Sequence, residues 1–263
     1  MKKETIKILF IGDIVGRPGR NAVKAILPII KEKENIDFVF ANGENLAAGR
    51  GMTIEKYQEM IEAGVDYFTS GNHIWNNKAF IENLDDSKVK VLRPENYPVG
   101  NPGRGIAEIG EDLVLVNLQG RVFMPDDVND PFESAQNIVN QYKSKIIVID
   151  FHAEATSEKV ALGYYLDGKV AAILGTHTHV QTADDSILPN GTGYISDIGM
   201  TGPKVSVLGV EKEIIIEKFL TQLPKSHKVA VGEMIFSAIL LEINIKSKKT
   251  IKIKRIFKQV SSN

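Results

Sequence analysis

The most constraining feature of this sequence is a short apolar run that ends in polar residues and recurs along the chain. Its first copy, residues 6–13, reads IKILFIGD. Comparable runs rich in Val, Ile and Leu lie at 36–45, 65–73, 112–120, 145–154 and 170–179. Segments with helical spacing of apolar residues, at 19–33 and 53–64, separate the first three runs. Apolar strands that alternate with amphipathic helices predict an α/β fold in which helices cover the sheets.

Two stretches rich in proline and glycine interrupt this alternation. Residues 93–105 and 120–135 are predicted to be long loops, which often carry function in compact domains. Pro28 falls inside the helical segment at 19–33. Because proline lacks a backbone donor, we expect it to kink or interrupt that helix.

The C-terminal part follows a looser pattern, yet we expect one domain over residues 1–263. Residues from about 203 to 235 contain one predicted helix and little strand, which indicates a small appendage or an oligomerisation element. Residues 236–258 alternate apolar and polar side chains around a polar turn, which predicts a hairpin with one solvated face. The lysines of this hairpin are interpreted as protection of an edge strand.

The composition excludes several classes of protein. The chain has 263 residues, 25% of them charged, and a net charge of −1, so no global field favours nucleic acid or an acidic membrane. The absence of cysteine rules out disulfides and thiolate metal ligands. No apolar stretch approaches the roughly 20 residues of a membrane helix, and the N-terminal run is too short for a signal peptide. We therefore expect a cytoplasmic protein.

Residues that can bind metals follow the predicted strands at their carboxyl ends. They are Asp13, Glu44, Asn45, Asn72, His73, His152, His177 and His179. Four of the five histidines belong to this set, and His227 is the exception. Ligands of open α/β sheets bind outside the carboxyl ends of the strands, so we expect these side chains to meet at one edge of a sheet.

Two cations fit this set better than one. Ligands without sulfur suit Mn²⁺, iron or Zn²⁺, and two ions about 3.5–4 Å apart that share a carboxylate would use all the candidates. Since alternate residues of an extended segment point to opposite sides, His177 and His179 are predicted to bind one ion each. Alone, Asp13 is more simply a turn former and His152 a satisfied core histidine, so the prediction rests on the coincidence of the motifs.

The ordered motifs resemble those of the calcineurin-like metallophosphoesterases: GD, NGEN, GNH, FHAEA and GTHTH. The longer segments NGENLAAGRGMT, GNHIWNNK and THTHVQTADDSILPNGTGYISDIGMTGP are similar to the YmdB family of bacterial phosphodiesterases. The resemblance covers most of the chain. It implies a four-layer α/β/β/α metallophosphoesterase sandwich with a dinuclear metal centre.

The resemblance also implies a role for each candidate residue. The implied ligands of one ion are Asp13, Glu44 and His179. The implied ligands of the other ion are Glu44, Asn72, His152 and His177. Glu44 is then the bridge between the ions, and His73 lies beside the metals and assists the leaving group.

Three positions depart from the pattern of the superfamily. Val15 stands where the first motif normally has a histidine, and Glu44 stands where the second motif has an aspartate. Both changes alter the coordination of the first ion, and Asn45 is the nearest candidate to fill the gap. Ile74 replaces the acid that normally follows the GNH motif, which removes an orienting partner of His73.

The activity that the resemblance implies is the hydrolysis of small cyclic nucleotides by a metal-activated hydroxide. The implied cofactors are two divalent or trivalent ions, iron or manganese, with zinc or magnesium as alternatives. A phosphomonoesterase or phosphoprotein phosphatase stays open as a second interpretation, as does a metal-containing regulator that binds RNA. The expected binding partner is a small phosphodiester substrate, and no binding to a membrane is expected. Binding to nucleic acid is possible but not favoured, and a homo-oligomer stays open. No substrate-binding residue is assigned, because Arg17 and Arg50 fit an exposed surface position equally well.

Overall fold

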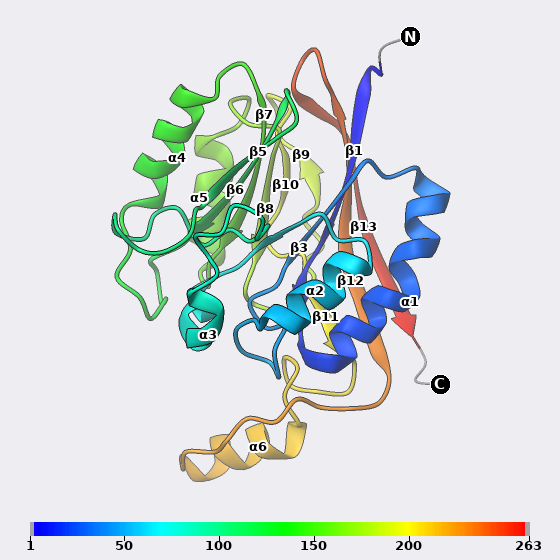
Figure 1. Ribbon diagram of the computed structural model, residues 1–263, viewed down its shortest axis with the longest axis vertical. Coiled ribbons are helices and arrows are strands. Elements are labelled where there is room, and N and C mark those ends of the chain that lie inside the picture. The colour runs from blue at the N-terminus through cyan, green and yellow to red at the C-terminus, as the bar shows by residue number, and fades with distance from the viewer. Residues whose placement is uncertain (1–2, 261–263) are drawn as a thin grey trace.

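The computed structural model describes residues 3–260, and its strands form two sheets packed face to face (Figure 1). The first sheet contains β1 (Thr5–Ile11), β2 (Asp13–Ile14), β3 (Phe38–Asn42), β4 (Tyr67–Thr69), β11 (Met200–Pro203), β12 (Met234–Asn244) and β13 (Lys249–Val260). The second sheet contains β5 (Ile106–Ile109), β6 (Leu113–Gln119), β7 (Ile146–His152), β8 (Ala172–Thr176), β9 (Ser186–Ile187) and β10 (Gly193–Ile195).

The order of the strands brings distant parts of the chain together. The first sheet runs β2-β11-β12-β1-β3-β4, with β13 also paired to β12, and the second runs β5-β6-β7-β8-β10-β9. Strands β1, β3 and β4 are parallel, whereas β12 is antiparallel to β1, with Thr5 opposite Asn244. The predicted C-terminal hairpin is present as β12 and β13.

Three apolar layers hold the molecule together. The central layer fills the space between the two sheets and includes Phe10, Phe40, Leu115, Val148 and Leu241. The second layer packs the first sheet against α1 (Gly16–Glu34) and α2 (Ile54–Glu62), and the third packs the second sheet against α4 (Pro131–Gln141) and α5 (Thr156–Tyr165). This arrangement confirms the four-layer α/β/β/α sandwich.

Two local expectations need correction. Helix α1 is not interrupted at Pro28, which lies on its exposed side, so water can satisfy the carbonyl of Lys24 that loses its helical donor. The predicted loop at 120–135 ends earlier than expected, because α4 begins at Pro131. Within residues 3–260, no helix combines the length and the apolar character of a membrane span.

The segment between β11 and β12 contains α6 (Lys212–Thr221), which projects away from the two sheets (Figure 1). Of its apolar side chains, Ile215 is buried, whereas Phe219 is 70% exposed and Leu220 is 80% exposed. The short helix α3 (Lys78–Ile81) lies in the connection that leaves β4. Helix α6 is relevant to the site because its C-terminal end lines the cavity described below.

Candidate metal centre

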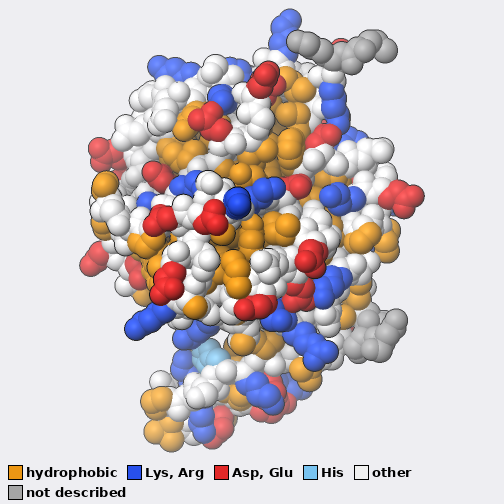
Figure 2. Space-filling model, in the orientation of Figure 1, with side chains coloured by type: hydrophobic (Ala, Val, Ile, Leu, Met, Phe, Trp, Pro, Cys, Tyr) orange, Lys and Arg blue, Asp and Glu red, His pale blue; other side chains and the backbone are white. Residues whose placement is uncertain are grey.

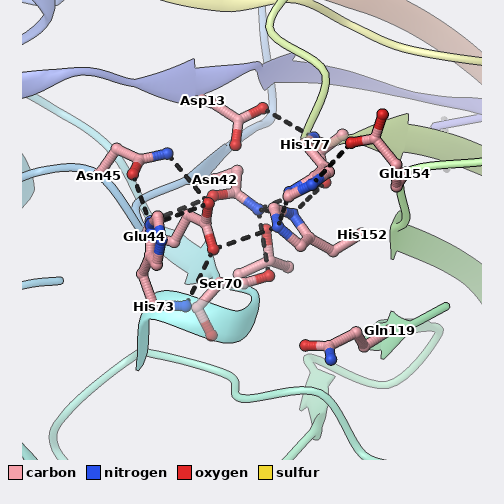
Figure 3. A network of polar contacts seen from close by, with 12 residues as sticks. Asp13, Asn42, Glu44, Asn45, Ser70, His73, Gln119, His152, Glu154 and His177 are labelled. Carbon is pink, nitrogen blue, oxygen red and sulfur yellow. Dashed lines mark hydrogen bonds and ion pairs between the residues drawn. The ribbon is translucent and has the colours of Figure 1, made fainter. Parts of the chain in front are cut away.

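The carboxyl ends of strands from both sheets supply one cluster of polar side chains (Figure 3). From the first sheet come Asp13, which follows β1 and begins β2, Glu44 and Asn45 after β3, and His73 of the 3₁₀ helix η1 (Asn72–Asn76) after β4. Asn72 directly precedes His73 as the first residue of η1. From the second sheet come His152 at the end of β7 and both His177 and His179 after β8. The cluster therefore draws on two sheets, rather than on one edge of a single sheet.

Two groups of ligand atoms share one carboxylate. The atoms of Glu44, His152 and His177 lie within 4.8 Å of one another, and so do those of Asp13, Glu44 and His179. The Oε2 atom of Glu44 is 3.1 Å from His152 Nε2, and that nitrogen is 3.0 Å from His177 Nδ1. On the other side, His179 Nε2 is 3.8 Å from Asp13 Oδ1. Glu44 is thus placed between the two groups.

A buried hydrogen-bond chain orients the ring of His152. The hydroxyl of Thr176 donates to Asp150 Oδ1 over 2.6 Å, so its oxygen is free to accept a proton from His152 Nδ1, 2.9 Å away. His152 Nε2 is then the ring atom that faces Glu44. Such outer partners fix the tautomer of a metal-ligating histidine. Asp150 was not predicted as a site residue, although it stands in the same VIDFH segment as His152.

The ring of His177 has its own partner. Its Nε2 lies 3.0 Å from the carboxylate of Glu154, so Nδ1 is the ring atom that points toward His152 and Glu44 (Figure 3). Glu154 was also missed, although it lies in the FHAEA motif. A carboxylate on the far nitrogen orients a ligating imidazole and raises its basicity.

The loop that carries both histidines has an unusual backbone. The φ angles of His177 and His179 are 100° and 66°, in the left-handed region that residues with a side chain seldom adopt. Asp197 holds this loop: its Oδ2 accepts from the amide of Thr178 over 2.9 Å and from Nζ of Lys159 over 2.8 Å. Lys159 also donates to the carbonyl of Thr176 over 2.8 Å. Both ionic side chains are buried, so the loop conformation depends on an ion pair closed off from water.

Breaking this buried pair is expected to destabilise the protein and its metal site. Lys159→Met and Asp197→Asn should each lower the free energy of unfolding by about 3–5 kcal/mol, because each leaves one buried charge without its partner. The double variant should lose much less than the sum of the two. Urea unfolding in the presence of a chelator measures these costs, and metal analysis of each variant measures the effect on the histidine loop.

An exposed ion pair provides the matched control. Lys204 and Glu233 are joined over 3.0 Å on the surface, and Lys204→Met should change the free energy of unfolding by about 0.5 kcal/mol or less. If the losses of unfolding free energy for Lys159→Met and Asp197→Asn simply add in the double variant, the two side chains act independently. Their ion pair then does not hold the loop.

Asn45 connects Glu44 with His73. Its side-chain nitrogen donates to Glu44 Oε1 over 3.0 Å and lies 3.1 Å from His179 Nε2. Its oxygen accepts from His73 Nδ1 over 2.9 Å. The ring of His73 therefore has an orienting partner from the residue after Glu44, in place of the acid that is missing after the GNH motif. Burial lowers the pKa of His73, and the charge of Arg50 lowers it further against the opposite effect of Glu44.

Glycine is required immediately before Asn72. A Cβ atom at Gly71 would lie 2.1 Å from Cδ2 of His152 and 2.5 Å from Oε2 of Glu44. Neither group can move away, because both belong to the cluster. The glycine of the GNH motif thus lets the chain after β4 approach the ligands that the second sheet supplies.

Burial and mutual charge shift the pKa values of the carboxylates and histidines in the cluster. Burial raises the pKa of Asp13 to about 7. Burial also opposes ionisation of Glu44, but the neighbouring His152 outweighs it and holds the pKa of Glu44 well below its usual range. In turn, Glu44 overcomes burial and raises the pKa of His152 to about 9. Burial and the nearby His152 lower the pKa of His177 to about 3, which leaves its ring neutral, as a ligand must be.

The residues present fit bound cations. Oδ1 of Asp13 and Oδ1 of Asn72 are buried and have no hydrogen-bond partner within residues 3–260. An unsatisfied buried acceptor costs about 1–3 kcal/mol, and a cation removes that cost. Both atoms belong to predicted ligands, and the donor set of carboxylate, amide and imidazole suits hard to borderline ions. Together with the ligand groups that share Glu44, these two oxygens are an independent indication of a metal site.

A cavity of about 370 Å³ opens onto this cluster. Glu44, Asn45, His73, His177 and His179 line it on one side. Arg50, Phe219 and His227 line it as well, although none of the three had been assigned to the site from the sequence. No local motif marks His227, which stands in the loosely patterned segment between β11 and β12. Its inclusion follows from the way that segment folds back over the site.

A two-sheet α/β/β/α sandwich with a carboxylate and histidine cluster at the strand ends defines the metallophosphoesterase class, and the chain is a hydrolase of phosphate esters. It belongs to the family of YmdB-like proteins, whose model matches residues 9–256. A 2′,3′-cyclic-nucleotide 2′-phosphodiesterase of Bacillus subtilis (strain 168) is 47% identical over 95% of this chain and 96% of that protein.

Two solved structures are similar to this chain throughout. A hypothetical protein from Thermus thermophilus is 41% identical with a TM-score of 0.90, and the match covers 97% of this chain and 99% of the other. A novel phosphatase from Mycoplasma pneumoniae is 34% identical with a TM-score of 0.93, and the match covers 98% of this chain and 94% of the other. These relatives are similar over the whole sandwich, including the segments that carry the cluster.

Proposed function

We propose that this protein is a metal-dependent phosphodiesterase that hydrolyses small cyclic nucleotides at a dinuclear centre. The observation that carries the proposal is the position of Glu44, whose carboxylate belongs to both groups of ligand atoms. The 2′,3′-cyclic-nucleotide phosphodiesterase from Bacillus subtilis supports the choice of substrate, since it is 47% identical to this chain. We take 2′,3′-cyclic nucleotides as the first substrates to test.

The proposed ligands divide between two ions. Asp13, Glu44 and His179 hold one of them. Glu44, Asn72, His152 and His177 hold the other. Iron or manganese fits this set best, with zinc or magnesium as alternatives. When bound, two such ions supply a water of lowered pKa and positive charge for the phosphate oxygens.

The side chains around the ligands supply a proton to the leaving group and orient the ligating imidazoles. His73 donates its Nδ1 proton to Asn45 Oδ1, so Nε2 is the ring atom available to the departing oxygen. Because burial lowers the pKa of His73, the protonated ring is a stronger acid, although it is the less populated form at neutral pH. Glu154 and the chain of Thr176 and Asp150 keep the imidazoles of His177 and His152 in fixed orientations. We therefore assign His73 as the general acid and Asn45 as the residue that positions it.

The direct test is hydrolysis of a chromogenic phosphodiester and of 2′,3′-cyclic adenosine monophosphate, each with and without Mn²⁺. A chromogenic phosphomonoester is the comparison substrate, because the Mycoplasma pneumoniae relative is described as a phosphatase. Faster turnover of both diesters, dependent on metal, supports the proposal. Preference for the monoester would favour the phosphatase, and no turnover of any ester would favour a regulator that keeps the site for binding.

Metal content is the next prediction. Protein purified without chelator should approach two ions per chain by elemental analysis, and removing them should lower the unfolding temperature, because ligands that bind only the folded state stabilise it. Recovery of the unfolding temperature on adding Mn²⁺ is the control for irreversible damage. Crystals soaked in excess Mn²⁺ that contain a single ion at Glu44 would contradict the dinuclear centre.

A further inference from the structure

The cavity at the candidate metal centre adjoins a larger one. The second cavity has a volume of about 650 Å³ and lies against α6 and the segment that follows it. Arg50, Phe219 and His227 line both cavities, so they form the boundary between them. A third cavity of about 260 Å³ is also lined by Arg50 and His227. A ligand at the metal centre can therefore extend past these residues into space that the scissile phosphate does not use.

The larger cavity carries uncompensated positive charge. Arg50, Lys218 and Lys225 line it, and of these Lys225 is paired with Glu217. Neither Arg50 nor Lys218 forms an ion pair with any residue of the described range 3–260. Figure 2 shows Lys, Arg and His side chains gathered where α6 meets the rest of the molecule. Unpaired cations that line a cavity concentrate anions there.

Arg50 is close to both ends of this space. It lines the first cavity together with His73 of the metal centre, and it lines the larger cavity together with Lys218 and His227. Two acids line the first cavity, and both are held by histidines: Glu44 is paired with His152, and Glu154 with His177. Arg50 is thus free to bind an anionic group of the ligand that lies at the boundary between the two cavities.

We propose that Arg50 and Lys218 form a second anion subsite, which binds a further phosphate of the substrate while the scissile phosphate lies at the metal centre. The proposal rests on the proposed cyclic-nucleotide phosphodiesterase activity and specifies its substrate class. The preferred substrate carries a cyclic phosphate and a second phosphate on the 5′ side of the same ribose. That second group is either a 5′-monophosphate or the internucleotide phosphate of a short RNA end.

The wall between the two cavities suits the nucleoside that joins the phosphates. Phe219 presents an exposed aromatic ring to both cavities, and aromatic rings stack on nucleobases without selecting one base. His227 adds a second ring, and its lowered pKa keeps it neutral near pH 7. Neighbouring Leu220 is even more exposed but lines neither cavity, which makes it a control for Phe219.

The kinetic test compares substrates with and without a second phosphate on the 5′ side. These are adenosine 2′,3′-cyclic phosphate, the same compound with a 5′-phosphate, and the dinucleotide ApA ending in a 2′,3′-cyclic phosphate. The second phosphate should raise kcat/KM about tenfold, mainly through a lower KM, which corresponds to one charge-assisted contact. Arg50→Gln and Lys218→Gln should abolish this gain, whereas the matched surface changes Arg17→Gln and Lys212→Gln should keep it. The 5′-phosphate and dinucleotide arms identify which source the subsite prefers.

A binding test separates the subsite from the activity. Calorimetry compares the affinities of adenosine 3′,5′-bisphosphate and adenosine 3′-monophosphate. For the metal-loaded wild type, the bisphosphate should bind about tenfold tighter than the monophosphate. For Arg50→Gln, the two nucleotides should bind with equal affinity. Phe219→Ala should weaken both nucleotides alike, and Leu220→Ala neither. If the bisphosphate binds tighter while no cyclic nucleotide is hydrolysed, the subsite stands and the proposed activity fails. If cyclic nucleotides are hydrolysed but the second phosphate changes neither kcat/KM nor affinity, the subsite is wrong.

Discussion

Replacing Glu44 with glutamine is expected to lower kcat/KM for a phosphodiester about 10³-fold, which corresponds to several kcal/mol at the transition state. The amide keeps the shape of the side chain but removes the negative charge that the two groups of ligand atoms share. Two cations about 3.5–4 Å apart repel each other, and a carboxylate between them offsets that repulsion. Loss of this charge should therefore affect both ions.

The comparison for Glu44→Gln is Asp13→Asn, since Asp13 belongs to one ligand group only. We expect the Asp13 variant to retain more activity and to lose one ion in preference to the other. Elemental analysis and circular dichroism of both variants separate metal loss from unfolding. Turnover close to wild type in Glu44→Gln, with both ions retained, would show that Glu44 does not bridge.

His73→Ala is expected to slow substrates in proportion to the basicity of the leaving group. A ribose oxygen departs poorly without a proton, so cleavage of a cyclic nucleotide should slow about 10²–10⁴-fold. Nitrophenolate departs without a proton, and its ester should slow far less. Metal content should stay unchanged, because His73 is outside both groups of ligand atoms.

Asn45 provides a further variant for the same question. Asn45→Ala removes the acceptor of His73 Nδ1 and should reproduce part of the selective loss, since the ring is then free to rotate. If His73→Ala slows the substrates with both leaving groups equally, or if it loses a metal ion, His73 does not transfer a proton. Its role would then be to order η1.

The long strands of the parallel segments could be predicted from the sequence, as could the short strand β4 in the run at 65–73, whereas β9, β10 and β11 could not. Strands β1, β6 and β7 are mostly apolar because nearly all of their residues are buried. Strands β9, β10 and β11 have two to four residues each, and the last two contain glycine, so their pairing depends on neighbours that are distant in sequence. The start of α4 did carry a local signal: Asp130 caps it and Pro131 occupies its first turn.

The candidate ligands could be predicted because each stands in a short motif at a strand end. Their supporting residues could not, since the role of a buried acid depends on its partner. In the sequence, nothing distinguishes Asp197 from other aspartates, because its partner Lys159 is distant along the chain and contacts it only in the folded protein. Arg50 and His227 gain their significance only when the segment between β11 and β12 folds over the site. The assignment of individual ligands and of His73 stays a prediction until the variants are measured.

The position of β12 next to β1 has a consequence for synthesis on the ribosome. β1 is among the first segments to emerge, but its antiparallel neighbour at Met234–Asn244 emerges only after the ligand-bearing strands of both sheets. Until then one side of an apolar strand has unpaired backbone groups, which can pair with other chains. The nascent protein thus passes through a stage at which its metal ligands are already made while its first sheet is still open.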